Sequence, residues 1–344
     1  MRIIDSHVHL DFHQPEKLLA LTEHYRYERF AVMAIPCEGD PLNTLECLRM
    51  KLLAPERAYV YGGMIYPPHM LHDGRSHVRQ LEFMMDAGCD GWKLLEGKPS
   101  VYRQLQIPLD GPVFEDAFAM AEREHIPVTW HAGDPATFWD ADKAPRFAVE
   151  NHWLCIGEGY PSLQEIYRQV ENVLERHPRL RVSMAHLYFT SDDRPHAERL
   201  LECYEDFRLD LTPGVEMYQS FVTDPEGWSR FFEKYQDRLI FGTDLSDTEH
   251  EVVFSDQDKL FDRIHRVLSS GDAVEIAGVS GRGLGLSQEI QEKLYRKNFL
   301  DRIAGAPRPL NSSGLHAYGR WLLERLPEEE QARAHGLLEM LCAK

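Results

Sequence analysis

The sequence IIDSHVHL at residues 3–10 is a short β-rich run in which two histidines stand two positions apart. In a β-strand, residues i and i+2 point to the same face, so the imidazoles of His7 and His9 can converge on one ion. This stretch therefore predicts a first strand that supplies two metal ligands.

Along the rest of the chain, short apolar β-rich runs alternate with longer segments of helical character. Eight such runs are present, at residues 3–10, 30–36, 59–66, 90–95, 127–132, 182–187, 207–211 and 239–242. Apolar residues at three- and four-residue spacing, as in amphipathic helices, occur at residues 43–53, 78–87, 114–124, 163–176, 197–207 and 257–268. Alternating β and α elements specify a parallel sheet, and eight of them predict an α/β fold of the (β/α)8 TIM-barrel type. An open, doubly wound sheet is the alternative.

The length of the chain leaves room for additions to this barrel. A barrel of this type takes about 250 residues, whereas the chain has 344. We expect residues 1–305 to form the barrel. Residues 134–160 are too long for a simple connection and hold several aromatic side chains, so a lid or pocket wall over the catalytic face is expected there. Residues 306–344 are expected to form a C-terminal helical extension packed on the barrel.

Charge and cysteine usage exclude several classes of protein. Lys plus Arg number 38 against 56 Asp plus Glu, which gives a net charge of −18. This charge repels phosphate backbones and anionic membrane surfaces, so neither nucleic acid nor a membrane is expected as a partner. The six cysteines are widely separated without a C-x-x-C pair, which is typical of free thiols in a reducing cytosol. The first run begins within two residues of the N-terminus, and no apolar run approaches the roughly 20 residues of a membrane span, so a cytoplasmic protein is expected.

Three more residues of metal-binding type lie near the ends of β-rich runs. His131 and His186 lie near the ends of the fifth and sixth runs, and Asp244 lies two positions beyond the eighth. Barrel enzymes place their active sites at the C-terminal ends of the strands. A lone His-x-His pair is weak evidence in a chain with 17 histidines, but five residues at equivalent positions make a chance origin improbable. Such a shell leaves an open position on a divalent ion such as Zn²⁺, which lowers the pKa of bound water to about 7.

This ordered set resembles that of the amidohydrolase superfamily, and more closely its branch of amidohydrolase-related proteins that includes aminocarboxymuconate-semialdehyde decarboxylase. The resemblance spans roughly residues 1–305. It implies that one catalytic divalent metal, with Zn²⁺ as the expected ion, is held by His7, His9, His131 and Asp244. It also implies that His186 lies beside the metal-bound water and acts in catalysis together with Asp244.

Lys93 leaves the metal count open. It lies on the fourth run, where binuclear amidohydrolases carry a carboxylated lysine that bridges two ions. The decarboxylase-like branch generally uses one metal, and a lysine here can instead serve a substrate anion or pair with a carboxylate such as Glu96. We expect one metal per chain, with two as the alternative if Lys93 is carboxylated. The further substrate-binding candidates, which follow strand ends or lie on the expected lid, are Glu96, Trp139, Asp140, Tyr188 and Glu216.

The leading hypothesis is a metal-dependent hydrolase that attacks an amide, lactone or ester carbonyl of a small molecule, with Asp244 as proton donor. Non-oxidative decarboxylation of a small unsaturated or aromatic acid is the alternative. The resemblance weakens it, because the semialdehyde decarboxylases bind the substrate carboxylate with an arginine just after strand two, and residues 35–40 hold none. Lys93, Lys98 or Arg282 could take the place of that arginine. A third hypothesis is a non-catalytic metal-binding barrel. A homodimer would be ordinary for such an enzyme.

Overall fold

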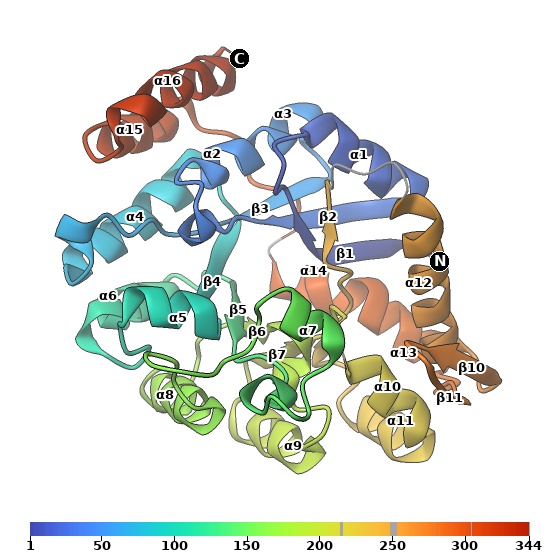
Figure 1. Ribbon diagram of the computed structural model, residues 1–344. Coiled ribbons are helices and arrows are strands. Elements are labelled where there is room, and N and C mark those ends of the chain that lie inside the picture. Colours follow the sequence, from blue (N-terminus) through green and yellow to red (C-terminus); the bar gives the residue numbers. More distant parts are fainter. Residues whose placement is uncertain (214–215, 248–252, 304, 344) are drawn as a thin grey trace.

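The computed structural model describes residues 1–213, 216–247, 253–303 and 305–343. Nine parallel strands form one sheet that curls around a central axis in the order β8-β7-β6-β5-β4-β3-β2-β1-β9 (Figure 1). These strands are β1 (Ile3–His9), β2 (Tyr27–Met33), β3 (Ala58–Gly62), β4 (Gly91–Gly97), β5 (Val128–Ala132), β6 (Val182–Met184), β7 (Phe207–Asp210), β8 (Leu239–Ile240) and β9 (Leu245–Ser246). The predicted TIM barrel is thereby confirmed.

The eighth predicted run closes the barrel in two pieces. Its first part, β8, pairs with β7, and the residues just beyond it continue into β9, which pairs with β1. Between the pieces, the amide of Asp244 donates to the carbonyl of His7 at 2.9 Å. Gly242 permits this close approach, because a Cβ at that position would lie 2.4 Å from Thr212 Oγ1 and 2.9 Å from His7 Cβ.

Helices surround the barrel (Figure 1). Those that follow strands β1 to β5 are α1 (Pro15–His24), α2 (Asn43–Leu48), α3 (Met50–Leu53), α4 (Gly74–Ala87), α5 (Pro99–Leu105), α6 (Pro112–Arg123), α7 (Arg146–Glu150) and α8 (Leu163–Arg176). Those that follow β6 to β9 are α9 (Arg194–Cys203), α10 (Met217–Thr223), α11 (Pro225–Lys234), α12 (Val253–Ser269), α13 (Gln288–Glu292) and α14 (Asn298–Arg302). Side chains cap several of them. Ser162, for example, accepts from the amide of Glu165 at the start of α8, which satisfies one of the free donors at a helix N-terminus.

Shorter elements complete the barrel. An antiparallel hairpin, β10 (Ala273–Ile276) and β11 (Val279–Arg282), follows α12. Single turns are η1 (Pro36–Glu38), η2 (Pro68–Met70), η3 (Ala136–Trp139), η4 (Ala185–Phe189) and η5 (Lys293–Lys297), the last of which is a π-helical turn between α13 and α14.

The core has two parts on opposite sides of the strands. The larger part fills the space between the strands and the surrounding helices. The smaller part lies inside the barrel near its N-terminal end, where Ile4, Met33, Tyr61 and Ile240 meet Phe299 from α14. Alternate residues along each strand feed the two parts, as the two-residue period requires. This inner cluster closes part of the barrel floor and leaves the opposite end for a site.

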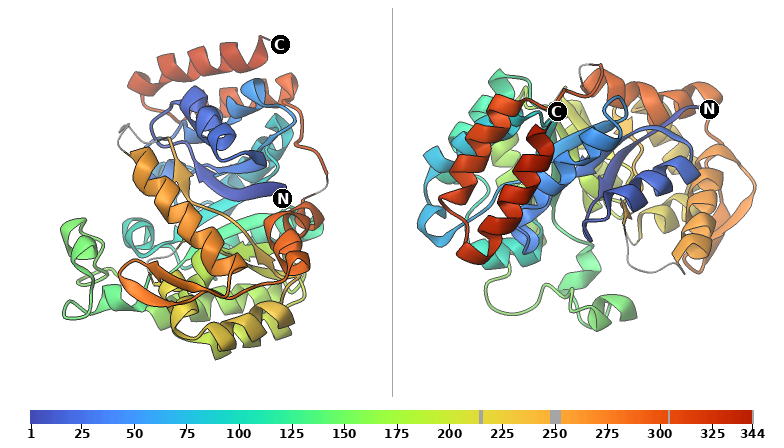
Figure 2. Two further views of the ribbon diagram at one scale, coloured as in Figure 1. Left: turned by 90° about the vertical axis from the view of Figure 1, so that its right-hand side faces the viewer. Right: turned by 90° about the horizontal axis from the view of Figure 1, so that it is seen from above.

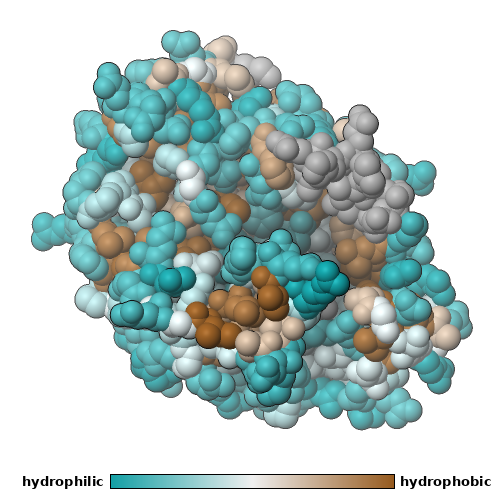
Figure 3. Space-filling view, in the orientation of Figure 1, coloured by the Kyte–Doolittle hydropathy of each residue, from teal (hydrophilic) through white to brown (hydrophobic). Residues whose placement is uncertain are grey.

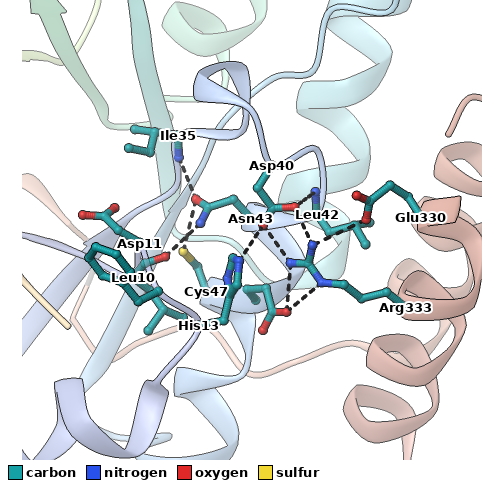
Figure 4. A network of polar contacts seen from close by, with 12 residues as sticks. Leu10, Asp11, His13, Ile35, Asp40, Leu42, Asn43, Cys47, Glu330 and Arg333 are labelled. Carbon is teal, nitrogen blue, oxygen red and sulfur yellow. Dashed lines mark hydrogen bonds and ion pairs between the residues drawn. The ribbon is translucent and has the colours of Figure 1, made fainter. Parts of the chain in front are cut away.

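The C-terminal segment forms two helices, α15 (Ser312–Leu323) and α16 (Glu328–Cys342), which lie side by side on the outside of the barrel (Figures 1 and 2). α15 packs on α4, and α16 contacts α15 and α2. Arg333 of α16 fixes this position, because its two terminal nitrogens each lie 2.8 Å from a carboxylate oxygen of Asp40 (Figure 4). Such a bidentate pair combines charge with a defined geometry.

Residues 134–160 project in front of the strand ends and contain η3 and α7 (Figure 1). Phe138, Ala148 and Cys155 form a small core of their own within this segment. Apolar side chains also gather on its outer surface (Figure 3), where Trp153 is 50% exposed. No helix in the described ranges of the chain is long and apolar enough to cross a membrane.

Candidate active site

A cavity of about 700 Å³ opens at the C-terminal ends of the strands. Its polar wall comes from strand ends and includes His9, Lys93, His131, His186 and Asp244. Its apolar wall comes from the 134–160 segment and includes Phe138, Phe147, Trp153, Cys155 and Tyr160. The structure thus brings residues that are up to 235 positions apart to one end of the barrel, where TIM-barrel enzymes hold their active sites.

Three of the four predicted metal ligands form the base of this cavity, where His9 and Asp244 line it and His7 lies fully buried next to them. His7, His9 and Asp244 each offer a ligand atom, and these atoms lie within 4.8 Å of one another. Asp244 Oδ1 is 3.2 Å from His9 Nε2 and 3.7 Å from His7 Nε2. Two imidazole nitrogens and a carboxylate oxygen are a donor set that suits Zn²⁺ and similar divalent ions. These three side chains therefore fit a divalent metal.

The Asp210 carboxylate orients the His7 ring through its Nδ1 atom. Asp210 Oδ2 lies 2.7 Å from His7 Nδ1, and both side chains are buried. Because a carboxylate accepts this hydrogen bond, the Nδ1 proton stays on His7, and Nε2 keeps its lone pair toward Asp244. Burial, followed by the charge of Lys93, lowers the pKa of His7 to about 4. A neutral imidazole is the form that binds a metal.

Asp5 connects β1 with the segment before Asp244. Its Oδ1 accepts from the amides of His7 and Thr243, each at 3.1 Å, and its Oδ2 accepts from the Thr243 hydroxyl. Burial raises the pKa of this carboxyl to about 7. Asp5 and Asp210 were not among the residues expected from the sequence. The signal available in the sequence was an aspartate within a predicted strand: Asp5 is two positions before His7, and Asp210 lies in the seventh run.

His131 and His186 form the adjacent side of the cavity. Their ring centroids are 4.8 Å apart, and the His186 ring lies 5.8 Å from that of His7. His131 Nε2 is 3.4 Å from Asp134 Oδ1, and His186 Nδ1 is buried without a partner among the described residues. Burial lowers the pKa of both histidines, which keeps the imidazoles neutral.

Lys93 points into the same group of side chains. Its Nζ is 3.0 Å from His7 Nε2, and burial lowers the pKa of its ammonium to about 8. Glu96, which we considered as its partner, instead accepts from the Tyr66 hydroxyl at 2.5 Å. Burial raises the pKa of Glu96. Lys93 thus lies among the predicted metal ligands, whereas the Glu96 carboxylate is directed to Tyr66.

The other predicted substrate-binding residues have contacts of their own. Trp139 Nε1 donates to the carbonyl of Pro161 at 2.9 Å, and Asp140 pairs with Lys143 at 2.7 Å on the surface. Tyr188 is fully buried, and Glu216 stands at the start of α10. Within the described ranges, neither these four residues nor Glu96 lines the cavity.

A second ionic group, which sequence reasoning only partly anticipated, lies at the side of the cavity. Lys98 Nζ is 2.5 Å from Glu38 Oε1, and both residues line the cavity. Although burial opposes the charge, Glu38 raises the pKa of Lys98. Asp134 also lines the cavity, and burial raises its pKa to about 7. The cavity therefore combines an apolar wall with charged groups of both signs.

Three comparisons place the chain among known proteins. No curated protein matches it. An uncharacterised TIM-barrel protein from Bordetella bronchiseptica has a similar structure, with 12% identity, a TM-score of 0.55, and coverage of 88% of this chain and 98% of the other. An amidohydrolase from Mycobacterium avium subsp. paratuberculosis shares 14% identity, with a TM-score of 0.44 and coverage of 83% and 73%. An amidohydrolase from Mycoplasma synoviae shares 13% identity, with a TM-score of 0.47 and coverage of 97% and 94%.

The family comparison covers most of the chain. The model of the amidohydrolase family matches residues 4–298, a span that begins in β1 and ends at the first residue of α14. It contains His7, His9, Lys93, His131, His186 and Asp244. The chain therefore belongs to the amidohydrolase family.

Proposed function

We propose that this protein is a metal-dependent hydrolase that cleaves an amide, lactone or ester of a small molecule. The observation that carries the proposal is the convergence of His7, His9 and Asp244 within 4.8 Å at the base of a cavity. His131 would be the fourth ligand. When bound, a divalent ion such as Zn²⁺ supplies a Lewis acid and allows water to ionise near neutral pH.

The side chains around this base have separate tasks. The Asp244 carboxylate lines the cavity and can take a proton from the attacking water and return it to the leaving group. His186 is neutral and faces the same space, so its ring can stabilise the charge that develops on the carbonyl oxygen. The charge of Asp244 is maintained because, against the effect of burial, His9 lowers its pKa.

The apolar wall formed by the 134–160 segment favours a substrate with an apolar or aromatic part. Phe138, Phe147, Trp153 and Tyr160 line the cavity opposite the polar base. An aromatic group packed against them would exclude water from the reacting carbonyl and gain stacking energy of about 1 kcal/mol per ring pair. The substrate is therefore proposed to present a carbonyl to the base and an apolar group to the lid.

Non-oxidative decarboxylation, the reaction of one enzyme in the branch that the sequence resembles more closely, is the second candidate. The observation in its favour is Lys98, whose ammonium lines the cavity and can bind a substrate carboxylate in place of the missing arginine. Its ion pair with Glu38 at 2.5 Å must then be exchanged for the substrate. This requirement makes hydrolysis the preferred proposal.

Metal analysis combined with product analysis tests the proposal. We expect about one divalent ion per chain and turnover of a panel of lactones, esters and amides to free carboxylates. Release of CO₂ from aromatic acids would instead support the decarboxylase. Stoichiometric metal without turnover of any class would favour a non-catalytic barrel. Failure to take up any ion on reconstitution would refute all three.

Single substitutions separate the roles of the ligands. His7→Ala and Asp244→Ala should remove metal and activity together. His186→Ala should remove activity while the metal is largely retained. Loss of metal in His186→Ala, or two ions per chain in the parent protein, would support a binuclear site in which carboxylated Lys93 bridges the ions.

A further inference from the structure

Four arginines gather at the end of the barrel opposite the active site. Arg181 immediately precedes β6, Arg208 lies in β7, Arg238 immediately precedes β8, and Arg302 ends α14. Strands β6, β7 and β8 are neighbours in the sheet, so the first three arginines come from adjacent strands at their N-terminal ends. Arg302 reaches the same place from the helix that lies under the barrel.

The alternation of side chains along β7 directs the Arg208 side chain into the barrel. Arg208 and Asp210 are two positions apart on β7, so their side chains share a face. Asp210 points inward, because it bonds to His7. Arg302 is 3% exposed and comes from the same helix as Phe299, which packs in the inner cluster. TIM-barrel interiors are normally filled by branched apolar residues, and here one side of the floor is cationic instead.

The guanidinium groups have fewer partners than their burial requires. Nε and Nη1 of Arg208, and Nε and Nη2 of Arg302, are buried without a hydrogen-bond partner in the described part of the chain. Arg302 Nη1 donates to the carbonyl of Asp206 at 2.8 Å, and the nearest carboxylate oxygen of that residue is 3.8 Å away. This one long ion pair reaches a carboxylate that is itself 35% exposed, and buried charges that are incompletely paired are costly, by several kcal/mol per ion.

The neighbouring carboxylates of Asp206, Asp237 and Asp301 compensate this charge only in part, because burial still lowers the pKa of Arg208. Arg238 is satisfied by backbone carbonyls, with Nε 2.9 Å from the oxygen of Phe207. Asp237, the acidic residue beside it in the sequence, is 67% exposed and pairs with Lys293 at 2.8 Å. Burial, followed by the charge of Arg208, lowers the pKa of Arg302 to about 9. The cationic groups therefore lie close enough to destabilise one another.

We propose that Arg181, Arg208 and Arg302 bind a small oxyanion at the barrel floor, of the size and charge of inorganic phosphate. Guanidinium groups present paired N–H donors that match phosphate and carboxylate oxygens, and the four unpartnered nitrogens supply such donors. An anion here would be a structural counter-ion, because the catalytic cavity lies at the other end of the strands. This site is independent of the proposed hydrolase function.

Thermal unfolding of the full chain tests this site. Inorganic phosphate at 10 mM should raise Tm by about 5 °C relative to NaCl at the same ionic strength. A shift of this size is expected when the phosphate concentration is roughly 100-fold above Kd. Calorimetric titration should give about one phosphate per chain. Arg208→Gln should abolish the shift. Arg181→Gln should reduce it, and this second variant provides the test if Arg208→Gln fails to fold.

Phosphate that binds in the catalytic cavity is distinguished by a control. Lys98→Gln removes a cation of that cavity, and Arg146→Gln removes an exposed surface arginine; both variants should keep the full shift. The proposal is overturned if Arg208→Gln and Arg181→Gln retain the shift of the parent protein. It is also overturned if phosphate produces no shift and the purified protein carries no phosphate or other oxyanion.

Discussion

Replacing Asp210 by Asn is the sharpest test of how the site is built. Asp210 Oδ2 is 2.7 Å from His7 Nδ1, and both side chains are buried. Asp210 Oδ1 also accepts from the amide of Thr212 at 2.6 Å. The variant keeps the shape and volume of the side chain, but an amide presents one oxygen where the carboxylate presents two. If the oxygen turns toward His7, the bond from the Thr212 amide is lost. If the oxygen stays on Thr212, the amide NH2 faces His7 Nδ1, and His7 can accept from it only by moving its proton to Nε2, the atom that would bind the metal.

The size of the effect follows from this loss. A hydrogen bond to a buried charged group contributes about 1.5–3 kcal/mol, and 1.4 kcal/mol corresponds to a tenfold change in affinity. Loss of the partner that orients a metal-binding histidine costs about 10–100-fold in metal affinity. We expect Asp210→Asn to weaken Zn²⁺ binding by that factor, while the secondary structure of the barrel is kept.

Competition with a chromophoric chelator measures this affinity, and circular dichroism checks the fold. Asp237→Asn is the matched control, because this aspartate forms a surface pair with Lys293 and should bind metal like the parent. If Asp210→Asn binds Zn²⁺ within threefold of the parent while His7→Ala loses it, then the orientation of His7 does not depend on Asp210, and the reasoning is wrong.

Three further predictions concern packing and charge. Gly242→Ala places a Cβ 2.4 Å from Thr212 Oγ1 and should cost about 1–3 kcal/mol in denaturant unfolding; an unchanged midpoint would show that the strand can move. Glu171 has its pKa lowered to about 2, with the hydrogen bond from His196 the largest cause, so its contribution is present above pH 4.5 and is lost as the pH falls through 2. After screening this contribution is about 1 kcal/mol, and Glu171→Gln should flatten that part of the pH–stability curve. Arg333→Gln breaks the pair with Asp40 and should lower Tm by about 2–4 °C, whereas an equal Tm would mean that apolar packing alone holds α16.

The order and kind of the barrel strands could be predicted from the sequence, because each strand is an apolar run between helical segments. The end of a strand was harder to place. The sixth run was expected to continue to residue 187, but β6 ends at Met184. α1, α10, α11 and the β10–β11 hairpin were not predicted, since their patterns are short or lie in segments without a clear period.

The candidate ligands could also be predicted, whereas their supporting residues could not. Asp210 is 203 positions from His7, and only the barrel geometry brings the two together. Side-chain direction explains why the Glu96 carboxylate does not pair with Lys93. It is three positions from Lys93, an odd spacing that puts the two side chains on opposite faces of β4. A position near a strand end therefore indicates the neighbourhood of the site but not which residues enter it.

Backbone strain is concentrated where the strands deliver side chains to the site. Residues 186–189 all have positive φ, between 52° and 56°, and Asp244 has φ 61°. A left-handed conformation costs a non-glycine residue roughly 1–2 kcal/mol, so the run of four costs several kcal/mol. Leu187 and Tyr188 within it are fully buried, and burial of each contributes about 2–3 kcal/mol in return.

This balance connects packing with function. An extended continuation of β6 would turn Leu187 away from the core that it now fills. The left-handed turn keeps Leu187 and Tyr188 buried and, in the same step, brings the His186 ring to 4.8 Å from His131 and 5.8 Å from His7. Predictions that assume a regular backbone fail at such a point, because they include neither the cost of the left-handed conformation nor the gain from burying the side chains that follow. The strained turn is therefore held by the apolar side chains that follow His186, and their burial fixes where that imidazole stands in the cavity.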